Sequence, residues 1–192
     1  VSRGLGDVYK RQVVSDDAKE KMKNRKTPIA SFYANLMAFD GYYEKKWFPY
    51  TMPISDIYGL RAAFNLIAGD KTLYERHARI GSATRAAVKE AGLKLHLQSG
   101  YSNTVTVFDI PECTDAKSIL DEMRTKYNIM LAGSFDELSG KVIRIGHMGE
   151  NARLEHMVPA LEALSATLTD LGVTLQGNLA DLFLKHYREF QD

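Results

Sequence analysis

Arg144 is the residue of this chain whose type and surroundings most clearly indicate ligand binding. It lies in the segment Gly-Lys-Val-Ile-Arg-Ile-Gly-His-Met-Gly at residues 140–149. The alternation of Ile143 and Ile145 with Val142 and Arg144 predicts a short strand with the guanidinium on one face. Gly146 and Gly149 follow, and because they have no side chains an anionic ligand could approach the backbone closely there. Arginine offers a planar fork of donors that matches a carboxylate. The alternative is a surface or edge-strand arginine in a salt bridge, and periodicity alone favours that alternative.

Thr51 is a second candidate for anion binding. It precedes Met52-Pro53 and a predicted helix, so its hydroxyl is expected near a helix N-terminus. Backbone donors and the helix dipole favour an anion at such a point. Pro53 in the first helical turn is also ordinary capping chemistry, so the local pattern alone does not separate the two interpretations.

The remaining reactive residues show no catalytic or metal-binding pattern. His147 directly follows Gly146 and could titrate near neutrality, but a loop histidine bonded to backbone is the favoured interpretation. The other histidines have no metal-ligand spacing with one another or with carboxylates, so no metal site is expected. Cys113 is the single cysteine; it has no neighbouring cation to activate it and is expected to be inert.

The predicted elements from residue 72 onward follow the order α-β-β-α-β-β-α. Helices are expected at 72–91, from a Thr114 cap to about residue 127, and from about 154 to Gly172. Strands are expected at 93–97, 105–110, 129–132 and 142–146. Paired strands between helices predict an α+β fold: a small, mostly antiparallel sheet with helices on one face.

The sequence before residue 72 and after Gly172 is helical or irregular. Ser15 is expected to cap a helix at Asp16–Lys23, and a further helix is expected at 54–68. Between them, residues 29–46 are rich in aromatic side chains and only loosely helical. Residues 178–190 form an amphipathic pattern to which we assign no function.

Composition excludes several classes of partner. The chain of 192 residues has 25 Lys+Arg against 24 Asp+Glu, a net charge of +1, so no electrostatic footprint for nucleic acid or membrane emerges. No apolar run approaches the ~18 residues of a membrane span, and no signal-peptide pattern is present. We expect a cytoplasmic protein.

Three segments resemble the class V aminotransferases that use pyridoxal phosphate. They are Phe48-Pro-Tyr-Thr-Met-Pro-Ile-Ser-Asp-Ile-Tyr-Gly-Leu-Arg61, Met130-Leu-Ala-Gly-Ser134 and Gly140–Gly149. The chain from Val13 to about Gly172 is similar to the C-terminal part of the alanine–glyoxylate and serine–pyruvate aminotransferase branch. The resemblance implies the small domain of fold-type I enzymes, preceded by a helical remnant of the large domain.

The resemblance also implies roles for individual residues. Arg144 matches the arginine that binds the substrate α-carboxylate. Thr51 matches a threonine that helps to hold the phosphate of pyridoxal phosphate in the neighbouring subunit of a homodimer. A tyrosine often shares that role at the position of Phe48, whose ring has no donor; Tyr50 is a possible substitute. Ser134 is a weaker candidate near the substrate-side mouth.

The domain boundaries follow from this resemblance. Residues 1–12 match nothing and are interpreted as a non-native leader, with a short basic arm as the alternative. Residues 13–70 are interpreted as the large-domain remnant, 71–176 as the small domain and 177–192 as a helical tail. Lys10 lies too close to Val13 to match the Schiff-base lysine, so we expect the chain to lack that lysine and to be inactive alone. With most of the large domain missing, the aromatic residues of 29–50 are expected to be exposed.

The expected function of the complete enzyme is transfer of an amino group between a small amino acid, alanine or serine, and pyruvate or glyoxylate. Desulfurases and phosphoserine aminotransferases are alternatives within class V, but a desulfurase needs a reactive cysteine on a mobile loop, and the surroundings of Cys113 do not fit. A stand-alone α+β ligand-binding or regulatory module without catalysis is the alternative outside the family.

Overall fold

The structure is a computed structural model that describes residues 14–190. The chain divides into two compact units, one that ends at Asn65 and one that begins at Leu66. The division falls inside helix α3 (Ile54–Gly69), close to the boundary expected at 70/71. The expected leader, residues 1–12, lies outside the described residues.

The second unit contains a small antiparallel sheet. Strand β1 (Val105–Asp109) pairs with β2 (Val142–Gly146), and Val107 lies opposite Arg144. Isolated bridges add one residue on each outer side, Leu95 to Phe108 and Ala132 to Arg144.

The strands expected at 93–97 and 129–132 are therefore wrong as full strands, although both segments lie beside the predicted partners. The first is an outer segment whose Leu97 is already 46% exposed where the chain leaves the sheet. The second begins after Asn128, the left-handed cap of a helix, and ends at the Gly133 turn. Each segment has a single neighbour over a short length, so only one bridge forms in each.

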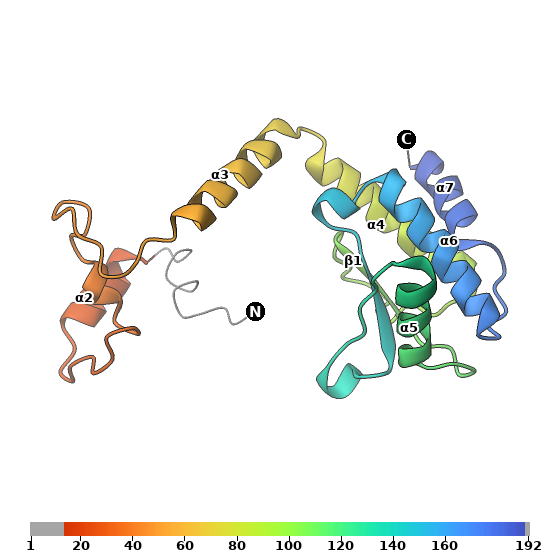
Figure 1. Ribbon diagram of the computed structural model, residues 1–192, viewed down its shortest axis with the longest axis horizontal. Helices are drawn as coiled ribbons and strands as arrows, with labels where there is room; N and C mark the ends of the chain where they lie inside the picture. Colours follow the sequence, from red (N-terminus) through yellow and green to blue (C-terminus); the bar gives the residue numbers. More distant parts are fainter. Residues whose placement is uncertain (1–13, 191–192) are drawn as a thin grey trace. The chain divides into compact units, whose positions relative to one another are not determined.

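Four helices share a core with this sheet: α4 (Leu73–Glu90), α5 (Ala116–Tyr127), α6 (Leu154–Asp170) and α7 (Leu179–Glu189), shown in Figure 1. Of these, α4 contacts β1, whereas α7 packs on α4 and α6. Phe108, Ile143 and Ile145 extend from the sheet into the core, where Ile80 of α4 and Leu161 of α6 are also fully buried. Alternate strand residues point the other way, and Arg144 is among them. The predicted α+β class is confirmed.

The helix ends follow local capping chemistry, with one correction. Ser15 caps α2 (Asp16–Lys23) as expected by accepting a bond from the backbone N–H of Ala18. The cap of α5 is Asp115 rather than Thr114, because the Asp115 carboxylate accepts from both the backbone N–H and the hydroxyl of Ser118. The hydroxyl of Thr114 is buried and has no hydrogen-bond partner in the described chain.

The last helix, α7, is part of the second unit's core. Leu179, Ala180 and Phe183 are buried, and the helix packs against α4 and α6. His186 and Lys185 of α7 both bond the Glu90 carboxylate at the end of α4. The described part of the expected tail, up to residue 190, thus shares a core with the unit that precedes it.

The first unit exposes its apolar side chains. It contains α2, the 3-10 turn η1 (Leu36–Phe39) and most of α3, and none of these elements has a buried residue. The predicted exposure of the aromatic segment is confirmed for Phe32, Tyr33, Tyr43 and Trp47, which are 57–68% exposed. Phe39, Phe48 and Tyr50 are instead half-buried, and their rings pack on one another. Along α3, the large apolar side chains are 47–73% exposed: Ile54, Ile57, Tyr58, Leu60, Phe64, Leu66 and Ile67. Exposed large apolar side chains in such number are typical of surfaces that another protein element covers.

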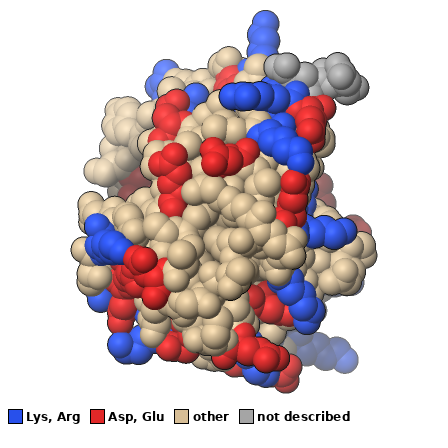
Figure 2. All heavy atoms as spheres, turned by 90° about the vertical axis from the view of Figure 1, so that its right-hand side faces the viewer, with Lys and Arg blue, Asp and Glu red and all other residues tan. Residues whose placement is uncertain are grey.

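Charged side chains of both signs are interspersed on the face drawn in Figure 2, around an uncharged area. This face shows no large patch of one sign, in agreement with the balanced composition. Within residues 14–190, no helix combines the length and the apolarity that crossing a bilayer requires.

Candidate functional site

Arg144 lies in the middle of β2 and is held on both sides by backbone pairing. It is opposite Val107 of β1, and on its other side it exchanges two backbone bonds with Ala132: Arg144 N–H to Ala132 O at 2.7 Å and Ala132 N–H to Arg144 O at 3.3 Å. The guanidinium leaves the sheet on the face opposite Ile143 and Ile145, which are buried in the core. The residue is half-buried, so part of it is open to solvent.

The Arg144 side chain forms one hydrogen bond and one ring contact. Its Nε–H donates to the carbonyl of Gly133 at 2.6 Å, and its Cζ lies 5.6 Å from the centre of the Phe135 ring. No ion pair to Arg144 forms within the described chain. The Nη groups therefore remain available for an anion, and the salt-bridge alternative is not realised among these residues. Sequence reasoning missed Phe135, because a loop phenylalanine next to a turn has no pattern that links it to an arginine nine positions later.

His147 fixes the segment that follows Arg144. It is fully buried; its Nδ1 bonds the carbonyl of Asn103 at 3.1 Å and its Nε2 bonds the hydroxyl of Thr106 at 2.9 Å. A carbonyl can only accept, so Nδ1 carries the proton and Nε2 accepts from Thr106. Burial lowers the pKa of His147 to about 4, so the ring is neutral at pH 7. The interpretation of a backbone-bonded histidine is confirmed.

A second histidine holds the next turn. The backbone N–H of Gly149 donates to Nε2 of His77 at 3.0 Å, and Nδ1 of His77 bonds the carbonyl of Leu73 at 2.6 Å. Gly149 begins the 3-10 turn η3 (Gly149–Asn151) with φ +60°, a conformation that glycine adopts without steric cost. Hydrogen bonds of His147 and His77 thus connect the segment after β2 to both β1 and α4.

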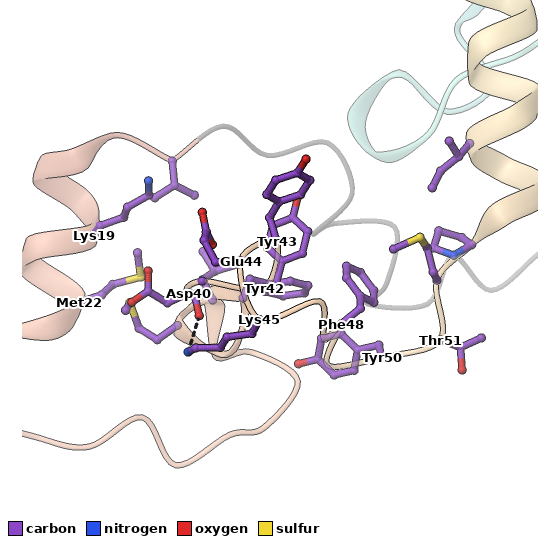
Figure 3. Close-up of a pocket in the computed structure, with 18 residues that line it drawn as sticks. Lys19, Met22, Asp40, Tyr42, Tyr43, Glu44, Lys45, Phe48, Tyr50 and Thr51 are labelled. Carbon is purple, nitrogen blue, oxygen red and sulfur yellow. Dashed lines mark hydrogen bonds between the residues drawn. The ribbon is translucent and has the colours of Figure 1, made fainter.

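Thr51 belongs to the first unit and lies at the start of α3. It is exposed and lines one end of a cavity of about 1020 Å³ whose walls combine aromatic side chains such as Tyr42 and Phe48 with aliphatic and charged ones. In Figure 3, Thr51 lies at the α3 end of the cavity, apart from the rings of Tyr42 and Phe48. An exposed hydroxyl beside a helix start is compatible with a phosphate contact.

The two aromatic neighbours of Thr51 contribute differently. Phe48 has no donor, and its ring packs edge-on against those of Phe39 and Tyr42. The hydroxyl of Tyr50 donates to the carbonyl of Phe32 at 2.9 Å, so its proton is already used. Any phosphate contact from this segment would rest on Thr51.

The contacts of the other candidate residues, Ser134, Cys113 and His96, give no indication of a catalytic or metal-binding role. Ser134 is half-buried in the turn after Ala132, and Cys113 is exposed with its Sγ 3.8 Å from the carbonyl of Gly172. His96 bonds the Asp109 carboxylate at 2.7 Å on the outer part of the sheet. In the described part of the chain, no group of three or more His, Cys, Asp or Glu side chains is arranged to hold a metal ion.

Comparison with known proteins places this chain among aminotransferases, although no family model matches it. It is 36% identical over 165 residues to a serine–glyoxylate aminotransferase of Methylorubrum extorquens, a match that covers 81% of this chain and 40% of that relative. Two of the similar solved structures illustrate the fold. The pyridoxamine–pyruvate aminotransferase of Mesorhizobium loti has a TM-score of 0.80 at 31% identity and covers 92% of this chain and 46% of its own. An alanine–glyoxylate aminotransferase of Nostoc has a TM-score of 0.73 at 32% identity, with 81% and 42% covered.

The match extends over most of this chain but over less than half of each of these three relatives. The similarity in sequence and in structure thus supports the family resemblance of the chain as a whole. The chain belongs to the class V pyridoxal phosphate-dependent aminotransferases and corresponds to less than half of such an enzyme.

Proposed function

We propose that this chain is the C-terminal part of an enzyme that moves an amino group between a small amino acid, alanine or serine, and glyoxylate or pyruvate. The observation that carries the proposal is the Arg144 guanidinium, which is held in place by Gly133 and faces no carboxylate of the described chain. The relatives act, by their names, on serine, alanine or pyridoxamine with glyoxylate or pyruvate. All of the named acids carry a carboxylate that such a guanidinium can bind.

The cofactor, when bound, supplies the electron sink for the reaction. In this proposal Arg144 binds and orients the substrate carboxylate. Thr51 contributes a hydroxyl to the cofactor phosphate of the neighbouring subunit in a homodimer. The start of α3 lies three residues after Thr51, and a helix N-terminus favours an anion, so the residues present fit that phosphate; the N–H of Ile54 already donates to the carbonyl of Met52 at 2.9 Å and is not part of the contact.

The exposed apolar surface of residues 29–69 supports a role as part of a larger assembly. A large apolar side chain contributes about 1.5–3 kcal/mol when it is fully buried, and the side chains along α3 are mostly exposed. The remainder of the enzyme, and the second subunit of the proposed homodimer, would cover this surface.

The direct test is transamination by the complete polypeptide that contains this chain. We expect measurable turnover with alanine or serine as donor and glyoxylate or pyruvate as acceptor, and none with the 192-residue chain alone. Absence of turnover by the complete, cofactor-loaded polypeptide with every pair would overturn the proposal. Turnover by the 192-residue chain alone would contradict the proposed division of the active site.

Chemical trapping tests a second part of the proposal, namely that no lysine of this chain binds the cofactor covalently. Lys10 lies outside the described residues, and we assign the role to no other lysine. We expect borohydride reduction of the 192-residue chain with pyridoxal phosphate to give scattered, substoichiometric labels in a peptide map. The complete enzyme serves as the control and should give one dominant label. A single stoichiometric label in the chain would refute the expectation.

One observation favours the stand-alone module as a second candidate. The unit from Leu66 onward has a core of its own, formed by α4–α7 and the sheet. A ligand-binding module would retain this core and show no turnover in any longer form, so the transamination assay also separates these two functions.

A further inference from the structure

The short segment Ala132–Phe135, which we call the Arg144 strap, holds the arginine at three successive points. Ala132 pairs with the Arg144 backbone, the Gly133 carbonyl accepts from Nε, and the Phe135 ring lies beside the guanidinium. These contacts act on the backbone, on the Nε edge and on the guanidinium itself. Neither Nη group donates a hydrogen bond within the described chain, so both remain available to an anion.

The occupied Nε edge limits how a carboxylate can bind. A guanidinium offers a side-on fork made of Nε and one Nη, and an end-on fork made of both Nη groups. Because Nε–H donates to Gly133 at 2.6 Å, the side-on fork is already in use. A carboxylate that approaches Arg144 must bind end-on, and the tilt of the guanidinium plane then decides whether both bonds form.

Phe135 is the part of the strap that is in contact with that plane. Its ring centre is 5.6 Å from Cζ, within the range of about 6 Å over which a guanidinium is attracted to an aromatic ring. The ring is 70% exposed, so the contact is open to solvent and belongs to the weaker class of cation–π interactions.

The backbone after Phe135 is constrained as well. Asp136, the next residue, has φ +53° although it is not a glycine, and it begins the 3-10 turn η2 (Asp136–Leu138). Leu138 and Ser139 donate back to the carbonyls of Phe135 and Asp136 at 3.3 and 3.0 Å. A positive φ at a non-glycine residue costs conformational energy and persists only where its surroundings impose it.

We propose that Phe135 is a positioning residue for Arg144: its ring fixes the plane of the guanidinium so that both Nη groups meet a carboxylate end-on. This inference rests on the proposed function of Arg144. Phe135 touches the arginine and not the reacting atoms, so its removal should weaken carboxylate binding and leave the chemistry unchanged.

In the complete enzyme, Phe135→Leu should raise KM for amino acids about two- to fivefold, the range expected for an exposed cation–π contact, with little change in kcat. Phe135→Tyr retains an aromatic ring, so its KM for amino acids should stay close to that of the parent enzyme. Amine substrates without a carboxylate should be unaffected. Phe190→Leu is the matched control, because Phe190 is an exposed phenylalanine at the end of α7 with no contact to Arg144.

A readout without turnover separates this inference from the proposed function. In the 192-residue chain, the Arg144 Nε–H resonance can be followed by NMR during titration with sodium acetate, with sodium chloride at matched ionic strength as the reference. We expect acetate binding to be about two- to fivefold weaker in Phe135→Leu than in the parent or in Phe135→Tyr, together with faster exchange of the Nε proton.

Equal acetate affinity and equal Nε exchange in the parent and Phe135→Leu would overturn the positioning role, whatever the enzyme does. A KM rise that is the same for substrates with and without a carboxylate would also overturn it. If the complete enzyme has no transaminase activity but the acetate result holds, the proposed function fails and the positioning role stands.

Discussion

Arg144→Lys in the complete enzyme is expected to lower kcat/KM for amino acids about ten- to a hundredfold, although the positive charge is retained. A lysine keeps a point charge but loses the second parallel hydrogen bond, and a hydrogen bond to a charged group contributes about 1.5–3 kcal/mol. A lysine also lacks the planar guanidinium that donates to the Gly133 carbonyl and lies beside the Phe135 ring. Steady-state kinetics with alanine or serine and glyoxylate measure the change.

Amines without a carboxylate are the internal control for this substitution. They do not use the guanidinium, so their rates should stay close to those of the unchanged enzyme. Equal losses for substrates with and without the carboxylate would mean that Arg144 supports the fold rather than the substrate. A thermal unfolding curve for Arg144→Lys, compared with the parent, detects such a loss of stability directly.

The second unit is expected to lose about 3 kcal/mol of stability through His147 as the pH falls from about 6.5 to about 4. The pKa of His147 is lowered to about 4 in the folded chain, against 6.5 when unfolded. Between these two pH values His147 is protonated in the unfolded chain and neutral in the folded chain, so lowering the pH favours unfolding. The contribution is fully present above about pH 6.5 and is lost by about pH 4. Urea unfolding followed by circular dichroism across this range measures it.

The comparison of parent and His147→Gln isolates this contribution from that of the carboxylates. The variant should be less stable at about pH 7.5, since the bonds to Thr106 and Asn103 are lost or weakened. Its disadvantage should shrink by about 3 kcal/mol at about pH 4, because it lacks the titrating ring. His156→Gln, at an exposed position of α6, is the control and should follow the parent. A constant difference between parent and His147→Gln at all pH values would contradict the buried neutral histidine.

Features that depend on neighbours along the chain could be predicted from the sequence. The observed bounds of the helices from α2 to α7 agree closely with those predicted from apolar periodicity and from end residues such as Ser15 and the terminating glycines. Both signals depend only on residues within one or two helical turns. The alternation around Arg144 likewise predicts a strand with the guanidinium turned away from the core, because successive strand residues point to opposite faces. The three motifs also indicated the family, because each of them is a contiguous run of residues.

Features that depend on pairs distant in the chain required the folded molecule. Burial lowers the pKa of His147, and that burial depends on residues far away in the chain, such as Thr106, which lies 41 positions earlier; no local pattern predicts it. The segments 93–97 and 129–132 pair at a single residue each because an outer segment has only one neighbour. Phe135 became a candidate only when the sheet brought its loop beside Arg144. Long-range contacts set burial, electrostatics and the orientation of side chains, and these properties are not encoded in local periodicity.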